Sequence, residues 1–393
     1  MSTAAAPDAD GVPARLAAYA RDYYHCADCS YCVDAVWAER GLDGVCPTIA
    51  HHRPVASWSG RGYLLAARAW FEGAAIDEDA LAERVFACSG CGHCEAVCPI
   101  GLRPAQIGAS LRELLVERSH APAPIADLRT AMRTHGNPYA LPAASRGDWA
   151  RDLVFAQDEA SLLYAPGCAA AWPAREEARA QVRVMQAAGE RVAWRGAADR
   201  CCGAPLREAG CTEDAQQAEA RLARDLAQTR VVTGGYECAP GWRRAAQGRA
   251  QVQTFGEWLH EALCTRRLQV EIDPGLRVHA FDGCAGRRPG EARVADPLRE
   301  ILALCGVEPV NDARGAAHAL CCGAAGTLPA VVPDAVKRMA AARLAAPSAA
   351  EAIVVADARC RAHLGEAARA RSSAPVLGLA ELLTAHARFG APA

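Results

Sequence analysis

The chain repeats one arrangement of strands, helices and cysteines twice between about residue 160 and its C-terminal end. Matched cysteines of the two copies lie 116, 120 and 122 residues apart, so the copies differ in length by only a few loop residues. This repeat constrains the fold strongly, because each copy must form the same supersecondary unit. The matched pairs are Cys168 with Cys284, Cys201 with Cys321, Cys202 with Cys322, and Cys238 with Cys360.

Short apolar strands alternate with amphipathic helices in both copies. Alternation of this kind favours parallel α/β layers, and it puts the cysteines at strand ends, where ligands gather. The predicted strands cover 162–164, 192–194, 231–233, 277–280, 307–310 and 353–355. The predicted helices cover 173–189, 214–228, 295–305 and 333–344. Two homologous α/β lobes are therefore expected.

The N-terminal part carries two further sets of cysteines. One set is a C-x2-C-x2-C-x3-C-P run, the spacing that holds a 4Fe-4S cluster and passes its fourth thiolate to a neighbouring cluster. The other set repeats the C-x2-C-x2-C half and closes with Cys46-Pro47 after a longer gap. We expect two 4Fe-4S clusters, one on Cys26, Cys29, Cys32 and Cys98, the other on Cys88, Cys91, Cys94 and Cys46.

These patterns predict an α+β protein, with an α-helical ferredoxin-type module followed by two duplicated α/β lobes. Helices are expected at 62–71, 76–85 and 105–117, where apolar residues recur at three- and four-residue steps. The segment 119–150 is rich in Pro, Ala and Arg and is predicted to lie over the surface of its neighbours. The expected domains are the ferredoxin-type module (1–118), a connector (119–158), lobe 1 (159–270) and lobe 2 (271–393).

Composition excludes some classes of function and narrows the compartment. The formal charge of -2 and the 6% aromatic content argue against a nucleic-acid partner, which requires an excess of Lys and Arg. The first residues lack a basic region followed by an apolar one, so we expect a cytoplasmic protein. In that reducing compartment, clustered cysteines indicate metal ligands or redox thiols. Without an apolar stretch of about 20 residues, contact with the inner face of the membrane would come through a partner.

Each lobe also contains a Cys-Cys-Gly sequence. Adjacent thiols point to different sides of an extended chain, so both serve one site only where the backbone bends, and Gly203 and Gly323 allow that bend. At these motifs the chain resembles the CCG-domain proteins, which include heterodisulfide reductase and the iron-sulfur subunits of glycolate and lactate oxidation. The resemblance extends from Cys26 to about Leu383.

The resemblance implies iron-sulfur clusters at the lobes as well. In the heterodisulfide reductase branch, five cysteines of each lobe bind an unusual cluster at which a disulfide is reduced. Here Gly235 and Asp357 stand where the fifth cysteine is expected. The segment 135–149 resembles the heterodisulfide reductase branch, whereas the single cysteine near Cys360 resembles the glycolate and lactate oxidation subunits. Each lobe is therefore expected to offer four ligands, from Cys168, Cys201, Cys202 and Cys238 and from Cys284, Cys321, Cys322 and Cys360.

Other residues have simpler interpretations. Zinc is usually held by two separated C-x2-C pairs, which disfavours zinc at the N-terminal cysteines. His363 is a surface or capping residue or a metal ligand, and His93 fills the loop between Cys91 and Cys94. Cys211, Cys264 and Cys305 have no counterpart in the other lobe and are predicted to be buried apolar side chains. No Gly-rich dinucleotide motif follows a strand, so neither flavin nor nicotinamide is expected on this chain.

Three functions are compatible with these features. The first is an iron-sulfur electron-transfer subunit similar to heterodisulfide reductase, which relays electrons between a flavoprotein or other redox partner and a thiol or disulfide site at the lobes. The second is a relay subunit of a flavin-dependent glycolate or lactate dehydrogenase, without catalysis at the lobes. The third is an interaction protein in which zinc only stabilises the fold.

Overall fold

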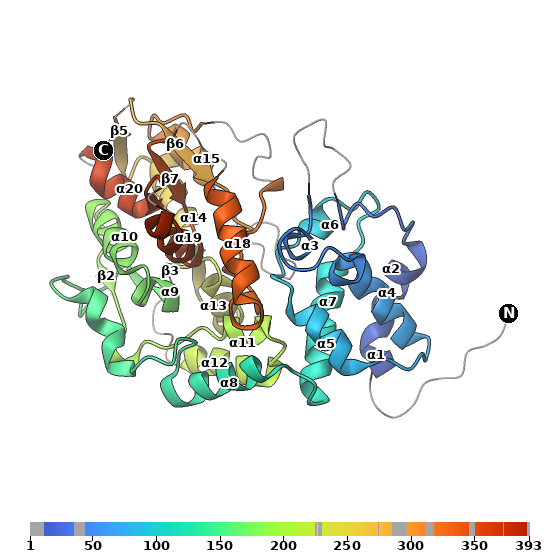
Figure 1. The fold of residues 1–393 in the computed structure, drawn as a ribbon. Coiled ribbons are helices and arrows are strands. Elements are labelled where there is room, and N and C mark those ends of the chain that lie inside the picture. Colours follow the sequence, from blue (N-terminus) through green and yellow to red (C-terminus); the bar gives the residue numbers. More distant parts are fainter. Residues whose placement is uncertain are drawn as a thin grey trace.

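A helical module lies beside a larger α/β part in the computed structural model (Figure 1). The structure describes residues 12–34, 44–224, 226, 230–273, 275–284, 297–310, 318–345, 350–371 and 373–390. The helices of the module are α1 (Val12–Ala17), α2 (Ala20–His25), α3 (Pro47–His51), α4 (Gly60–Phe71), α5 (Glu78–Phe86), α6 (His93–Ala96) and α7 (Pro104–Glu117). The helices expected at 62–71, 76–85 and 105–117 correspond to α4, α5 and α7. The predicted α+β fold class is confirmed.

The apolar steps that predicted these helices form the core of the module. Tyr63 and Leu64 of α4 are buried with Leu111 and Leu115 of α7, which lie on one face of that helix. Local signals set the helix starts. The Asp77 carboxylate accepts a hydrogen bond from the Ala80 amide and caps α5, and proline opens α7, where no intrahelical hydrogen bond is needed.

The segment after the module is more structured and more deeply buried than its composition suggests. It contains α8 (Ala123–His135) and the 3-10 helix η3 (Ala143–Ala150). The prediction of a connector lying over the surface is wrong for η3, since Trp149 is 1% exposed and Arg146 is 4% exposed. The Trp149 ring packs edge-on against Trp194 at a centroid distance of 5.1 Å, so η3 forms part of the core of lobe 1. Burial of the Trp149 ring stabilises the fold by more than the removal of the Arg146 side chain from water costs.

Lobe 1 contains a parallel four-stranded sheet in the order β2-β1-β3-β4. Its strands are β1 (Leu162–Ala165), β2 (Val192–Ala193), β3 (Arg230–Thr233) and β4 (Gln251–Thr254). Its helices are α9 (Gly167–Ala171), α10 (Arg175–Ala187), α11 (Ala204–Glu208), α12 (Thr212–Arg224), α13 (Cys238–Ala246) and α14 (Phe255–Cys264). The strands predicted for this lobe are present, and β4 is an additional strand. The predicted helices correspond to α10 and α12, but α12 ends at Arg224, and 225, 227 and 228 of the predicted helix lie outside the described residues.

Lobe 2 contains a parallel three-stranded sheet in the order β6-β7-β8. Its strands are β6 (Val278–Phe281), β7 (Ala352–Val355) and β8 (Val376–Gly378), and its helices are α15 (Leu298–Leu304), α17 (Leu328–Val331), α18 (Pro333–Leu344), α19 (Ala358–Arg371) and α20 (Leu379–His386). The strand predicted at 307–310 is wrong. These residues make one backbone bond to the sheet, from Val310 N to Val278 O, and 311–317 lie outside the described residues, as do 295 and 296 of the predicted helix.

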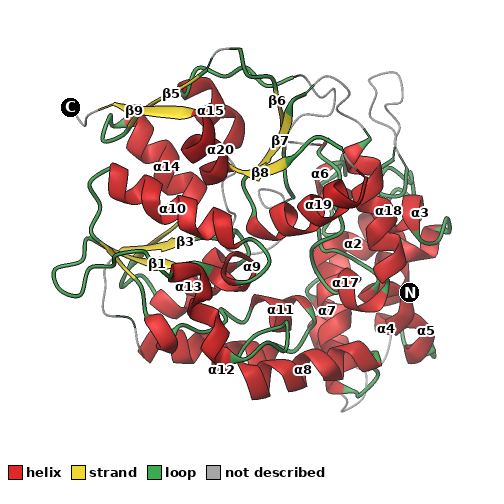
Figure 2. Ribbon diagram, turned by 60° about the vertical axis from the view of Figure 1, so that its left-hand side comes forward, coloured by secondary structure: helices red, strands yellow, loops and turns green. Residues whose placement is uncertain are grey.

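A small antiparallel pair and several helices join the lobes. Strand β5 (Gln269–Ile272), which follows lobe 1, pairs with β9 (Ala387–Gly390) at the end of lobe 2. Figure 2 shows α10, α14 and α20 grouped between the two parallel sheets. Glu177 of α10 accepts hydrogen bonds from the Ala380 and Glu381 amides at the start of α20, at 3.2 and 3.0 Å. The two lobes therefore share one core.

Glu177 makes the stability of this contact depend on pH. Burial, with the nearby Glu381 carboxylate, raises the pKa of Glu177 from 4.5 to about 7. A raised carboxyl pKa stabilises the folded state below pH 4.5, and this stabilisation is lost as the pH rises toward 7, by about 3 kcal/mol. We expect Glu177→Gln to lose less stability than wild type between about pH 5 and about pH 8 in urea titrations. The exposed Glu176→Gln is the control and should follow wild type, and equal slopes for all three proteins would contradict the prediction.

Candidate metal centres

The first cysteine loop of the module begins where α2 ends. Two non-glycine residues with positive φ, Asp28 at 54° and Ser30 at 64°, wind the chain so that the thiols face one space. Arg61 of α4 holds this loop through Asp28 at 2.6 Å and Ser30 at 2.7 Å. A cavity of about 170 Å³ results. Its cysteines are Cys26, Cys29, Cys32, Cys94 and Cys98.

The second cysteine loop lies between α5 and α7. Gly90 and Gly92 adopt φ values of 62° and 72°, which favour glycine, and the Gly90 amide donates to Cys88 Sγ at 3.4 Å. A smaller cavity of about 20 Å³ lies here, and its cysteines are Cys46, Cys88, Cys91 and Cys94. Each of the two cavities thus contains one of the two four-cysteine sets expected from the sequence. The gap between Cys32 and Cys46 falls partly outside the described residues, at 35–43.

The two cavities are neighbours, which the sequence does not reveal. Gly60 and Cys94 line both of them. A Cβ atom at Gly60 would lie 3.1 Å from Cys94 Sγ and 2.9 Å from Pro104 Cβ, so glycine leaves the room that this thiol occupies. Short separation of two centres favours electron exchange between them.

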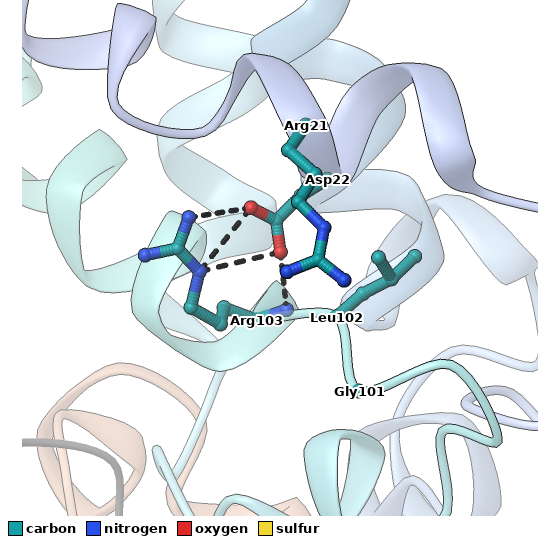
Figure 3. A pocket seen from close by; sticks show the side chains of 5 residues that line it. All are labelled: Arg21, Asp22, Gly101, Leu102 and Arg103. Carbon is teal, nitrogen blue, oxygen red and sulfur yellow. Dashed lines mark hydrogen bonds and ion pairs between the residues drawn. The ribbon is translucent and has the colours of Figure 1, made fainter.

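An ion pair fastens the end of the second loop to the start of the first. Figure 3 shows Asp22 and Arg103 facing each other in a surface pocket of about 340 Å³. The Arg103 guanidinium contacts Asp22 Oδ2 at 2.6 Å, and the Arg103 amide donates to Asp22 Oδ1 at 2.8 Å. Asp22 precedes Cys26 by one helical turn, and Arg103 follows Cys98-Pro99. The pair therefore holds Cys98 close to Cys26, Cys29 and Cys32.

The chemistry of these cysteines fits a group that carries positive charge. Burial raises the pKa of Cys32 to about 11 and that of Cys46 to about 12, with nearby cysteines adding to the effect. Crowded, buried thiols lose their protons readily only to a metal, because thiolate charge is otherwise too costly there. In the described part of the chain, no three His, Cys, Asp or Glu side chains form a group that could hold a single metal ion.

Lobe 1 brings its four predicted cysteines together at the carboxyl ends of β1 and β3. Hydrogen bonds link Cys201 to Cys168, and link Cys202 to Cys201 and Cys238. All four are buried. A Cβ atom at Gly167 would lie 2.7 Å from Cys238 Sγ, so this glycine makes room for the thiol. Hydrogen bonds from Cys201 and Cys238 lower the pKa of Cys202, and a hydrogen bond from Cys201 lowers the pKa of Cys168, with the Arg146 guanidinium as a smaller cause.

Lobe 2 repeats this arrangement in part. Cys322 Sγ lies 3.4 Å from Cys360 Sγ, and the Gly323 amide donates to Cys321 Sγ at 3.3 Å. Gly323 has a φ of 97°, in the region that favours glycine, so the bend expected at the Cys-Cys-Gly sequence is present. Cys284 packs against Cys321, and its loop continues into 285–296, outside the described residues.

The positions without a fifth cysteine have other roles. Asp357 accepts hydrogen bonds from the Arg359 and Cys360 amides at 2.9 and 3.0 Å and so caps the start of α19. A Cβ atom at Gly235 would lie 2.7 Å from both oxygens of the Glu237 carboxylate. Arg359, which precedes Cys360 in lobe 2, connects to lobe 1, since it contacts Glu237 at 3.6 Å and Glu208 at 2.8 Å.

Lobe 2 also meets the helical module at its cysteines. Cys91 forms a contact cluster with Cys284 and Cys321. A Cβ atom at Gly326 would lie 2.8 Å from the Cys88 carbonyl oxygen, and the Thr327 hydroxyl donates to Phe86 O. On the far side of this contact, the Arg338 guanidinium of α18 donates to His51 O of α3 at 2.8 Å. The cavity of the second cysteine loop thus adjoins the lobe 2 cysteines.

The remaining candidates divide between buried and exposed positions. His363 Nε2 lies 3.1 Å from Cys322 O, which agrees with a structural role beside the site. His93 is buried, and its Nδ1 lies 3.2 Å from Val45 O. Cys211 and Cys305 are buried as predicted. The prediction for Cys264 is wrong, because this residue is exposed at the end of α14, 3.7 Å from His260 Nε2.

Comparisons with known proteins find two kinds of domain in this chain. Residues 22–102 match a 4Fe-4S dicluster domain, and residues 162–239 and 278–365 match a cysteine-rich domain called CCG. No helix of the described residues combines the length and apolarity needed to cross a membrane.

Three relatives illustrate the similarity. The D-type subunit of the dihydromethanophenazine:CoB--CoM heterodisulfide reductase of Methanosarcina acetivorans is 26% identical over 79% of this chain and 80% of the relative. The protein of the same name from Methanosarcina mazei is 26% identical over 64% of each chain. EtfAB:quinone oxidoreductase of Syntrophomonas wolfei is 26% identical over 67% of this chain, which spans 42% of that protein.

Proposed function

We propose that the helical module of this chain feeds electrons to the lobes through Cys91. The premise is that the chain is an iron-sulfur electron-transfer subunit of an oxidoreductase, homologous to the D-type subunit of heterodisulfide reductase. A redox partner subunit, such as a flavoprotein, is the electron donor. One 4Fe-4S cluster is held by Cys26, Cys29, Cys32 and Cys98. The other is held by Cys88, Cys91, Cys94 and Cys46.

The contact of Cys91 with Cys284 and Cys321 carries this proposal. Electrons enter at the first cluster, whose Cys29 is exposed and thus accessible to a partner. They reach the second cluster across the wall formed by Gly60 and Cys94. From Cys91 they pass to lobe 2, and then to lobe 1 through the shared lobe core.

Each lobe holds a further iron-sulfur cluster on its four cysteines, and the thiol or disulfide site lies at these lobes. The clusters supply electrons singly, whereas a disulfide takes two electrons and two protons when its S–S bond breaks and two thiols form. Two lobe clusters suit this need, because one electron can reside on each. The chain's own contribution is burial, which excludes water from the cysteines, and hydrogen bonds to their sulfur atoms.

A relay subunit of a flavin-dependent 2-hydroxy-acid dehydrogenase is the second candidate. Asp357 favours it, since this residue caps α19 where a fifth cysteine is expected. In that case the lobes bind clusters or the partner, and the substrate is oxidised elsewhere. Turnover of disulfide acceptors by the reduced protein separates the two candidates.

The test is iron counting and anaerobic spectroscopy on wild type, Cys201→Ser and Cys321→Ser. Each substitution should remove the signal of its own lobe and leave the signals of the module, because the four-cysteine sets are separate. Cys211→Ser and Cys305→Ser are matched controls, since these thiols are buried in the same lobes outside the proposed sites. Unchanged spectra and iron content in both test variants would contradict clusters at the lobes. Zinc at about one per four-cysteine site, in colourless protein, would support the zinc-stabilised alternative.

A further inference from the structure

Arg146 is a buried cation that touches a proposed cluster ligand. Its Nη1 donates to Cys168 Sγ at 3.4 Å, and its side chain is 4% exposed. It comes from η3, outside the repeated part of the chain. A charged group is seldom buried so completely without a partner or a purpose.

Several contacts fix the guanidinium in place. Arg146 Nε donates to Asp199 Oδ2 at 2.7 Å, and Nη2 donates to Arg200 O at 3.3 Å. The Trp172 ring lies 5.1 Å from its Cζ, and the Trp172 indole in turn donates to Ser145 Oγ at 3.0 Å. With Nε on the carboxylate and Nη1 on the thiol, the delocalised charge of the guanidinium is shared between Asp199 and Cys168.

The segment before η3 is equally fixed. Asn137, which is 0% exposed, accepts hydrogen bonds from the Tyr139 and Leu141 amides and donates to the His135 and Leu141 carbonyls. Every polar group of this amide side chain is used. These hydrogen bonds fix the backbone before η3 and therefore help to hold Arg146 in one position.

The matched cysteine of lobe 2 has a different environment. Cys284 packs against Cys91, a proposed ligand of the adjacent cluster in the module. At Cys168, Arg146 adds positive charge and a hydrogen bond to sulfur. Net charge and hydrogen bonds to sulfur are main determinants of cluster potential. The hydrogen bond and positive charge of Arg146 therefore favour a higher reduction potential for a cluster held through Cys168.

We propose that Arg146 is a positioning residue that raises the reduction potential of the cluster at lobe 1. The proposal rests on the proposed function, because it requires a cluster bound through Cys168. A higher potential favours the arrival of an electron at lobe 1.

The test is anaerobic redox titration of each cluster signal by electron paramagnetic resonance. Arg146→Gln should make the lobe 1 cluster harder to reduce by about tenfold in equilibrium constant, which is about 59 mV for one electron and is the scale of one charge-assisted hydrogen bond. Asp199→Asn removes the compensating negative charge, so it should shift the same potential upward. The signals of lobe 2 and the module should stay constant in both variants.

Arg179→Gln is the matched control. Arg179 donates to Trp149 O at 2.8 Å and to Arg151 O at 2.7 Å, so it also holds η3, but no contact joins it to a cysteine in the described structure. Its lobe 1 potential should equal that of wild type. If Arg146→Gln loses the lobe 1 cluster, the upward shift in Asp199→Asn still decides the matter.

Failure of this inference and failure of the proposed function give different results. A loaded lobe 1 whose potential is the same in wild type and Asp199→Asn, or is lower in Asp199→Asn, overturns the role of Arg146 alone. Wild-type protein without iron at lobe 1 overturns the proposed function together with this inference.

Discussion

Replacing Cys91 with serine is expected to stop electron flow from the helical module to the lobes. Cys91 is a proposed ligand of the second cluster and also contacts Cys284 and Cys321, so one substitution affects both the cluster and its exit. We expect a loss of about four irons per chain. Transfer should fall by about 100-fold or more, because even residues that only support a ligand contribute about 10- to 100-fold to metal affinity or activity.

The measurement is iron analysis together with the rate at which lobe signals appear after anaerobic reduction of the module. Cys264→Ser is the control, since this thiol is exposed and belongs to none of the proposed four-cysteine sites, and it should behave as wild type. A Cys91→Ser protein with full iron and a normal transfer rate would exclude the proposed path.

Gly326→Ala is expected to separate the module from lobe 2 without removing any ligand. Its φ of 68° costs an alanine about 1 to 2 kcal/mol. The new Cβ would also lie 2.8 Å from Cys88 O, a clash with backbone that adds about 1 to 3 kcal/mol. Because the atoms met are backbone, we expect the junction to open to relieve this clash. Electron arrival at lobe 2 should therefore slow sharply, while iron content is kept.

Gly306→Ala is the control, because it introduces the backbone strain without the clash. Gly306 has a φ of 82°, and a Cβ there meets no atom within 4 Å. Both variants should lose stability, but only Gly326→Ala should slow the transfer of electrons in freeze-quench experiments. Equal transfer rates in the two variants would mean that the contact at Cys88 does not set the distance between the centres.

Local patterns predicted the elements that depend on local forces. The helices α4, α5 and α7 follow from apolar residues at helical spacing, and most strands of both lobes follow from short apolar runs. The strand expected at 307–310 failed although the neighbouring strand β6 has a free edge, since this run contains Pro309, which has no N–H to donate to a strand ladder. The prediction that Cys264 is buried also failed. A single cysteine carries no periodic pattern, so only packing decides whether it is buried.

The sequence by itself determined the kinds of domain in this protein: the cysteine spacings predict an iron-sulfur module and two homologous lobes, because a C-x2-C-x2-C loop turns three thiols toward one centre. The tertiary structure alone decided which sites adjoin one another. Cys91 precedes Cys284 and Cys321 by about 200 residues, and no spacing rule links them. The same holds for Arg146, one of several arginines in a segment rich in Pro, Ala and Arg. Contacts between distant segments come from the summed packing of whole faces, which no local pattern encodes.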